Sequence, residues 1–508
     1  MENKNSVFKV ALILSVVSIL SRPLGFIREQ VIAWRFGAGA TVDAYVAALF
    51  IPQLLAGIIG GILPTAFLPV YSEDRDTPEG RSLVATTAGA IALLGIAGSV
   101  LAQIFAPLLV RVLVGSFSAE QQAVTASLLQ VLSFGTFLMS LSAFLTILFN
   151  SHQQFFLPAL IPVLQNVIII AGLLLLGTWG IEGLAWSTLV SMGVTAVLLF
   201  MLALYRGFPV LAVPKFWNPK FIKVLKLSAP IFVSSLFGQV YMVVDRRLAS
   251  GLDVGSIAAL NFANRLVQLP VSIFVAALAT AAYPTLAALA SRGDKKGFAS
   301  TTISSLRGLV VLLVPATVGL WVLRYPIVRL AFERGSFDAA ATEKTAYALG
   351  FYALGLLGLA TAQVLTRAFF SLHDTLTPVK IGIATSLLNT ALALLLVYPL
   401  AHGGLALANS LGTSVSSLWL FYALRKKLGP VPMGMLPLLL KVGGASLVMG
   451  VTSAVVMAFT AGYGQIISLG AAVSLGLLVY GLSLLLAGVD EVALVLKKLQ
   501  NRFGKKLR

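Results

Sequence analysis

The stretch FKVALILSVVSILSRPLGFIREQVIA, residues 8–33, is a long apolar run that carries two arginines, Arg22 and Arg28. About 20 apolar residues are enough for a helix to cross the hydrocarbon core of a bilayer, which is about 30 Å thick. Runs of this kind recur to the end of the chain, separated by polar residues, glycine and proline. The pattern predicts an all-α membrane protein with 14 transmembrane helices, near 8–33, 42–71, 82–113, 119–150, 155–177, 181–205, 219–246, 254–290, 300–331, 341–372, 376–399, 402–425, 434–460 and 465–488.

The composition supports this class. Of 508 residues, 58% are hydrophobic and only 11% are charged, and the mean hydropathy is +0.96. Soluble domains keep roughly a quarter of their residues charged, because water-facing surface needs them. The chain has no cysteine and only three histidines, which excludes disulfides and thiolate chemistry and argues against a metal site.

Basic residues predict which loops face the cytoplasm. Lys4 and Lys9 precede the first run, which has no small-x-small cleavage site and is read as an uncleaved helix. If the N-terminus is cytoplasmic, about 23 basic residues lie on the inner side and about 8 on the outer side, among them Arg111, Arg246 and Arg247. We therefore expect both termini in the cytoplasm and attribute the net charge of +18 to this asymmetry, not to nucleic-acid binding.

An internal repeat divides the chain. The motif GSFS at 115–118 recurs as GSFD at 335–338, and GLA at 183–185 returns at 404–406, so the offset is close to 220 residues. Six helices per copy is an even number, so the copies share one orientation and form two parallel-repeat six-helix lobes. Such lobes around a central site are common in transporters that work by alternating access.

The repeat predicts four segments. They are an N-terminal six-helix lobe at 1–210, a C-terminal six-helix lobe at 211–430, two extra C-terminal helices at 431–490 and a basic cytoplasmic tail at 491–508.

Arginines within the predicted helices are the informative charges. A charge at the membrane centre costs at least about 2.5–3.5 kcal/mol, so it marks function or a partner. Arg22, Arg28 and Arg265 lie in the first two helices of their lobes, and we expect them to line a central cavity. Guanidinium groups suit a phosphate or pyrophosphate better than ammonium groups do. The alternative is that structural partners, such as Glu29 and Asp43, neutralise them.

Amides and absences narrow the function further. Asn261 and Asn264 flank the turn of Arg265 and are expected in the cavity, whereas Gln165 and Asn166 are interpreted as hydrogen-bonding glue between helices. No P-loop motif occurs, so the chain is not an ATP-driven pump by itself. No intramembrane pair of carboxylates is available for acid–base catalysis, so we expect a transporter and not an enzyme.

Several motifs resemble one known family. SRPLGFIRE at 21–29, FGAG at 36–39, the pair Asp43-Ala44, NRLVQLP at 264–270 and DTLTP at 374–378 closely resemble the MurJ (MviN) family of lipid II flippases. That family belongs to the multidrug/oligosaccharidyl-lipid/polysaccharide exporter superfamily. The resemblance covers essentially the whole chain, including the count of 14 helices.

The resemblance implies a flippase in the bacterial cytoplasmic membrane. Its cargo would be lipid II, the undecaprenyl-pyrophosphate-linked peptidoglycan precursor, moved from the inner to the outer leaflet. Arg22, Arg28 and Arg265 match the family's essential cavity arginines, and Asp43 matches its acidic residue at the start of helix 2. Helices 13 and 14 would form a groove for the polyprenyl tail.

The resemblance also bears on coupling and partners. Some members bind sodium in the second lobe, and Asp245, Asp374 and Thr390 correspond to that site, although Phe370 stands where a polar ligand is expected. The alternative driving force is the membrane potential, and no other cofactor is expected. The expected partners are lipid II, membrane lipids and the cell-wall synthesis machinery.

One difference between this sequence and the family leaves the identity of the cargo open. Many members carry basic residues after the Leu-Pro-x-Leu-Leu segment of helix 2, whereas this chain has Ala56 and Gly57. The first alternative is a flippase for another polyprenyl-linked glycan, and the second is a cation-coupled drug exporter of the same superfamily. A membrane-embedded glycosyltransferase is the most distant alternative.

Overall fold

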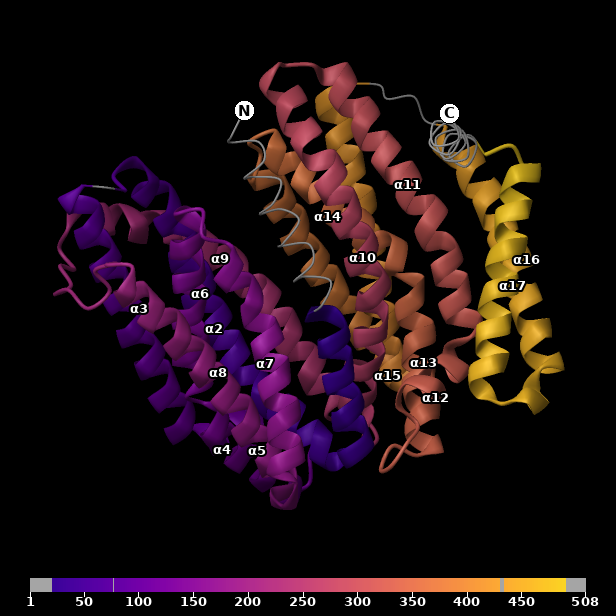
Figure 1. Cartoon of the computed structure of the whole chain (residues 1–508), viewed down its shortest axis with the longest axis horizontal. Coiled ribbons are helices and arrows are strands. Elements are labelled where there is room, and N and C mark those ends of the chain that lie inside the picture. Colours follow the sequence, from indigo (N-terminus) through magenta and orange to yellow (C-terminus); the bar gives the residue numbers. More distant parts are fainter. Residues whose placement is uncertain (1–20, 76, 430–433, 490–508) are drawn as a thin grey trace, which may run out of the picture. The chain divides into compact units, whose positions relative to one another are not determined.

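The computed structural model describes residues 21–75, 77–429 and 434–489, which form helices and no strand (Figure 1). The first half of the predicted helix 8–33 and the predicted basic tail at 491–508 lie outside the described residues. The chain divides into two compact units, the first comprising Met1–Ala258 with Arg334–Phe337 and the second Ala259–Glu333 with Asp338–Arg508.

The first unit begins with a helix whose described part covers residues 21–36. Its further helices are α2 (Ala40–Glu73), α3 (Pro78–Ile104), α4 (Ala106–Val114), α5 (Ala119–Leu132), α6 (Gly135–Ser151), α7 (Phe156–Leu175), the 3₁₀ turn η1 (Gly177–Trp179), α8 (Gly180–Tyr205) and α9 (Pro219–Ala249).

The second unit begins at Ala259, in the first turn of α10. Its helices are α10 (Ser256–Ser291), α11 (Lys295–Val322), α12 (Arg324–Phe332), α13 (Ala339–Leu354), α14 (Leu356–Ser371), α15 (Leu376–Leu428), α16 (Met435–Phe459), the 3₁₀ turn η2 (Ala461–Tyr463) and α17 (Gln465–Leu486).

Many of these helices have the length and composition of membrane spans. Among the described residues, nine helices qualify, and the number rises to eleven if each of two bent pairs forms one span. The bent pairs are α5 with α6, at 41°, and α13 with α14, at 47°. A helix satisfies its own backbone hydrogen bonds, which is why apolar runs in lipid fold this way.

The backbone repeats with the offset seen in the sequence. Eight residues with positive φ form four pairs whose members lie 218 to 222 positions apart. Within each pair the two φ values differ little. The pairs are Gly37 (φ 70°) with Gly255 (φ 89°), Gln153 (59°) with His373 (56°), Gly180 (60°) with Ala401 (46°) and Gly207 (74°) with Gly429 (92°). Two halves of the chain therefore follow the same sequence of helices and turns.

Helix caps explain why the GSFS motif recurs. Ser118 Oγ accepts a hydrogen bond from the Gln121 N–H at 3.2 Å and begins α5. Asp338 Oδ1 accepts from the Ala341 N–H at 2.8 Å and begins α13. A side-chain acceptor at this position satisfies one of the unpaired donors of a helix start, so the last residue of each motif is a capping residue.

The second copy of the motif packs on the first unit. The Ser336 N–H donates to the Trp34 carbonyl at 2.8 Å, and Ser336 Oγ donates to the Arg35 carbonyl at 2.9 Å. A Cβ on Gly37 would lie 2.4 Å from the Ser336 carbonyl oxygen, so the approach requires glycine. These contacts explain why residues 334–337 belong to the first unit.

Besides the two bent pairs, which correspond to the predicted helices 119–150 and 341–372, the predicted helices 82–113 and 300–331 are also each two helices in the structure. The first breaks at Phe105, between α3 and α4, and the second at Leu323, between α11 and α12. Pro107 and Pro326 follow the breaks within three residues. Proline has no N–H and its ring displaces the preceding turn, so the long apolar run does not continue as one helix.

Small residues bring the helices of each unit together. A Cβ on Gly60 of α2 would lie 2.7 Å from Ser140 Cα of α6, and one on Gly358 of α14 would lie 2.7 Å from Ser414 Cα of α15. Lipid offers no hydrophobic drive for helix association, so close backbone approach at small residues supplies much of the packing. The fully buried Phe67 and Phe144, whose ring centroids lie 5.3 Å apart, fill the same α2–α6 contact.

Candidate functional site

Arg28 is held by a buried polar cluster in the first unit. Its Nη2 forms an ion pair with Glu29 Oε1 at 2.5 Å, and its Nη1 donates to Asn166 Oδ1 at 3.1 Å. Glu29 is 4% exposed, whereas the Arg28 side chain keeps 22% of its surface accessible. The Arg28 Nε–H is buried and has no hydrogen-bond partner. Arg28 is therefore fixed in place by Glu29 and Asn166 but retains an unused donor.

Asn166 is a site residue that the sequence did not single out. It comes from α7, is buried, and also donates from Nδ2 to the Ser21 carbonyl at 3.4 Å. The two helices lie close together here, since a Cβ built on Gly25 would be in van der Waals contact with Asn166 Nδ2, at 3.5 Å. As predicted, the side chain of Asn166 joins two helices. It links α7 to the helix at 21–36 through Arg28 and the Ser21 carbonyl.

Arg22 lies on the same helix as Arg28 and is half-buried. Pro23 does not interrupt this helix within the described part, because residues 21–36 are helical throughout. Six residues correspond to about 9 Å of rise and leave the two side chains about 120° apart around the helix. Arg22 and Arg28 thus face different sides, and no hydrogen bond joins Arg22 to another described residue.

Asp43 caps a helix. Its Oδ2 accepts from the Gly255 N–H at 2.6 Å and its Oδ1 from the Ala258 N–H at 2.7 Å, and the residue is 2% exposed. Gly255 directly precedes α10 and Ala258 lies in its first turn, where backbone N–H groups lack helical partners. A cavity of about 340 Å³ opens beside it, lined also by Ser116, Gln121 and Ser250. Both oxygens of the Asp43 carboxylate therefore accept hydrogen bonds from the start of α10.

The remaining predicted cargo residues lie on α10 in the second unit. Arg265 is exposed, and Asn261 and Asn264 are half-buried. Asn261 occupies the place in the second copy that Asp43 has in the first, 218 residues earlier, which is also the offset of Gly37 and Gly255.

The residues matched to an ion site do not meet in one place. Asp374 lies before α15, while Thr390 is fourteen residues beyond Leu376 along that helix, a rise of about 21 Å. Asp374 Oδ2 binds Lys427 Nζ at 2.7 Å, and the Thr377 N–H and hydroxyl donate to the same carboxylate. Asp245 lies on α9 of the first unit. Asp374 and Thr390 therefore cannot hold one ion together, and no group of three or more acidic or histidine residues suited to a metal occurs in the described ranges.

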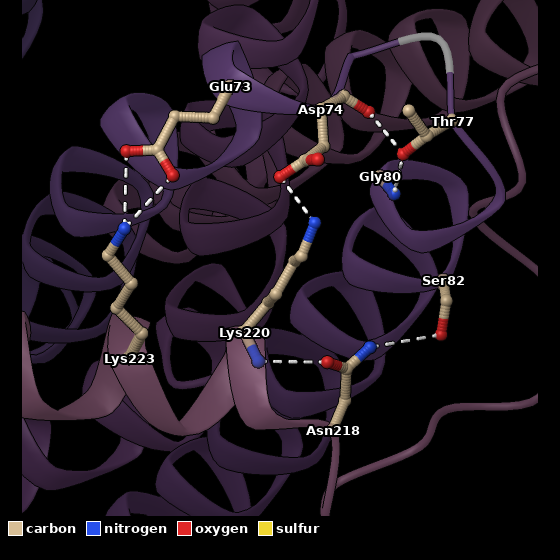
Figure 2. A network of polar contacts seen from close by, with 8 residues as sticks. All are labelled: Glu73, Asp74, Thr77, Gly80, Ser82, Asn218, Lys220 and Lys223. Atoms are coloured by element: carbon tan, nitrogen blue, oxygen red, sulfur yellow. Dashed lines mark hydrogen bonds and ion pairs between the residues drawn. The ribbon is translucent and has the colours of Figure 1, made fainter.

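Charged residues join α2 and α9 at one end of the first unit (Figure 2). Lys223 Nζ contacts Glu73 Oε2 at 2.9 Å, and Lys220 pairs with Asp74. Asn218 Oδ1 accepts from the Lys220 N–H and so caps α9. We call the four charged residues the α2–α9 latch. It ties the end of a helix in the first copy of the repeat to the start of the helix that opens the second copy.

Ala56 and Gly57 stand where many family members carry basic residues. Ala56 is buried on α2. Gly57 faces α9, and a Cβ built on it would lie 3.6 Å from Gln239 Nε2. Because Ala56 is 5% exposed, a long basic side chain at this position would require repacking.

Comparison with solved structures defines the class. The chain superposes on the lipid II flippase MurJ in its inward-closed conformation with a TM-score of 0.81, at 26% identity, covering 93% of this chain and 98% of that one. An inward-facing multidrug resistance MATE transporter of the MOP superfamily gives a TM-score of 0.67 at 17% identity, covering 84% of this chain and 99% of that one, which shows a shared fold. The fold is thus that of a helical membrane transporter of the MOP type.

Sequence comparison then gives the family. The family model described as lipid II flippase MurJ matches residues 32–475. The probable lipid II flippase MurJ of Vibrio cholerae serotype O1 is 30% identical over 443 residues, which cover 82% of each chain. This chain belongs to the MurJ family of lipid II flippases, and with its many apolar helices it is a protein of the bacterial inner membrane.

Proposed function

We propose that this chain moves lipid II from the inner to the outer leaflet by alternating access, with Arg22, Arg28 and Arg265 holding the pyrophosphate. Family membership supports the cargo. A pyrophosphate carries its charge on several oxygens, and planar guanidinium forks bind such groups in two places at once. Asn261 and Asn264 complete the contacts to the head group on the α10 side.

The unused donor of Arg28 is the observation that carries the proposal. A buried N–H without a partner costs about 1–3 kcal/mol, and an anion that reaches it recovers that cost. Glu29 and Asn166 keep the guanidinium in position before the cargo arrives, so little ordering is required on binding.

The proposal includes the architecture. Fourteen spans result if the helix at 21–36 is the described part of the first, if each bent pair is one span, if α15 forms two spans that meet at Ala401, and if α9 also spans. The two repeat copies then form lobes at 1–210 and 211–430, with both termini in the cytoplasm. Paired turns and caps in the two halves support this division.

The tail and the driving force belong to the same proposal. Helices α16 and α17 expose many large apolar side chains, including Leu440, Leu447 and Leu478, which suits them to bind a polyprenyl tail.

An inside-negative potential favours outward movement of an anion by about 2.3 kcal/mol per charge per 100 mV. The potential can therefore drive the cycle, with sodium as the alternative. We expect the cell-wall synthesis machinery to receive the product.

The test is complementation of a bacterial strain depleted of its own lipid II flippase, with lipid II exposure measured at the outer face. The unaltered chain should restore growth and exposure. Arg22→Ala, Arg28→Ala and Arg265→Ala should each abolish both while still inserting in the membrane. Arg329→Gln, on α12, is the matched control and should rescue fully.

Two results would contradict the proposal. Full rescue by all three alanine variants would show that these arginines do not form the binding site for the pyrophosphate. Failure of the unaltered chain to rescue, in cells where it is inserted and restores export of another polyprenyl-linked glycan, would assign it a different cargo.

A further inference from the structure

An apolar cavity of about 470 Å³ lies on the first unit, away from the arginine cluster of Arg28. It is lined by α2, α3, α4 and one residue of α9, Val243. The lining is almost wholly apolar, and several of its side chains, such as Leu101, Leu108 and Val112, are exposed. In a membrane such a surface meets hydrocarbon chains, not water.

The shape of the cavity fits one chain of one leaflet. It follows α3 and α4 from Leu101 to Leu113, twelve residues, which corresponds to about 18 Å of helix. One leaflet contributes about half of a hydrocarbon core of about 30 Å. The break at Phe105, which itself lines the cavity, bends α3 into α4 and hollows this surface.

Three arginines lie at one end of the cavity. Arg246 follows Val243 by one turn on α9, and its guanidinium carbon is 5.8 Å from the ring centroid of the lining residue Phe50. Arg247 donates to Ser116 Oγ at 3.3 Å, just beyond α4, and Arg111 lies in the last turn of α4. Arg246 is half-buried and the other two are exposed.

Two of these charges have no carboxylate partner in the described part of the chain, those of Arg111 and Arg247. Arg246 forms no ion pair there either, but its charge interacts with that of the neighbouring Asp245. The second copy of the repeat differs at this point. Arg329 of α12, which corresponds to Arg111, pairs with Glu333 at 3.0 Å. In the orientation proposed above, the three arginines are also on the outer side, where the positive-inside rule does not account for them.

We propose that this cavity binds an anionic phospholipid, with one acyl chain along α3 and α4 and the phosphate on Arg246, Arg247 and Arg111. The positive rim and the apolar chamber match the two parts of such a lipid, and guanidinium groups bind phosphate in a bidentate way. The site is separate from the cargo site, so it does not depend on which glycan the chain moves.

Binding of defined lipids tests the proposal. Purified full-length protein in detergent is titrated with palmitoyl-oleoyl-phosphatidylglycerol or with the matched phosphatidylcholine, and bound lipid is counted by native mass spectrometry. We expect phosphatidylglycerol to bind more tightly, and its dissociation constant to rise about tenfold or more in Arg246→Gln/Arg247→Gln. Leu109→Trp, which fills the chamber, should reduce retention of both lipids.

Controls separate the site from general charge and folding effects. Arg329→Gln should leave binding unchanged, because its charge is already paired. Arg246→Lys/Arg247→Lys keeps the charge and should bind within about threefold of the unaltered chain. Equal binding of the two lipids, or unchanged binding in the Gln pair at an unchanged melting temperature, would overturn the proposal. Displacement of phosphatidylglycerol by undecaprenyl phosphate would assign the chamber to the cargo tail instead.

Discussion

At Arg28 one guanidinium serves two partners, Glu29 and Asn166, and variants of these partners should act in opposite directions. Asn166→Ala removes a fixed acceptor, so Arg28 must be ordered by the anion itself, and affinity should fall by about 1.5–3 kcal/mol. Glu29→Gln removes the competing carboxylate, so affinity should rise by about 1 kcal/mol, or about fivefold. Binding of undecaprenyl pyrophosphate to purified protein measures both, and Gln165→Ala is the neighbouring control. Equal loss in both variants would mean that the cluster only holds the fold.

Asp374 makes the stability of one turn depend on pH. Burial by itself raises the pKa of the Asp374 carboxyl, but hydrogen bonds from Lys427 and Thr377 outweigh it and lower the pKa to about 2. A carboxyl whose pKa is lowered in the folded state stabilises it above the unfolded pKa of about 3.9, and this contribution disappears as the pH falls toward 2.

The measurement is the difference in melting temperature between the unaltered chain and Asp374→Asn in detergent. The difference should be constant from about pH 7 to 5 and shrink between about pH 4 and 2. A difference that persists unchanged at about pH 2 would show that the carboxylate charge does not contribute.

At the scale of the element, α15 is two helices joined at a strained residue. Ala401 has φ 46° and ψ −132°, a conformation that glycine adopts readily, and the corresponding residue of the first copy is Gly180, with φ 60° and ψ −141°. A side chain in such a region costs on the order of 1–3 kcal/mol. Ala401→Gly should therefore raise the melting temperature, with a gain of about 1 kcal/mol after the greater freedom of unfolded glycine is counted.

Gly180→Ala is the matched opposite. It should lower stability by at least about 1 kcal/mol, because no atom lies within 4 Å of its built Cβ and strain of the backbone is the remaining cost. Thermal unfolding followed by tryptophan fluorescence compares the two. The expected signs are opposite, and equal signs would refute the equivalence of the two turns.

The elements also show how far the sequence predicts the structure. The positions of most helices and the repeat followed from apolar runs and recurring motifs, since a helix in lipid needs little else. The breaks at Phe105 and Leu323 were missed because Pro107 and Pro326 interrupt runs that remain apolar throughout. At the site, the sequence did not predict that the carboxylate of Asp43 caps α10, a helix more than 200 residues away in sequence. Such pairings depend on tertiary packing and have no local pattern.

For the whole molecule, the α2–α9 latch matters because its ion pairs join the first copy of the repeat to the start of the second, within the first compact unit. Helix α9 opens the second copy but packs on α2 of the first. Alternating access requires the two copies to move relative to each other, so contacts of this kind form in one state and break in the other. The solved MurJ with a TM-score of 0.81 is in an inward-closed conformation. In the proposed orientation the latch is cytoplasmic, and we expect it to stabilise the closed state of that side.

Charge reversal at the latch tests this expectation. Exposed ion pairs contribute about 0.2–1 kcal/mol, so Lys223→Glu, which replaces attraction to Glu73 with repulsion, should shift the population toward inward-open by roughly two- to tenfold. Glu73→Lys combined with Lys223→Glu restores the opposite charges and should return the population to that of the unaltered chain. The chain has no cysteine, so spin labels at Ser72→Cys and Lys226→Cys report the distance between α2 and α9 directly. If the double reversal stays as open as the single one, the Lys223–Glu73 pair does not control the opening.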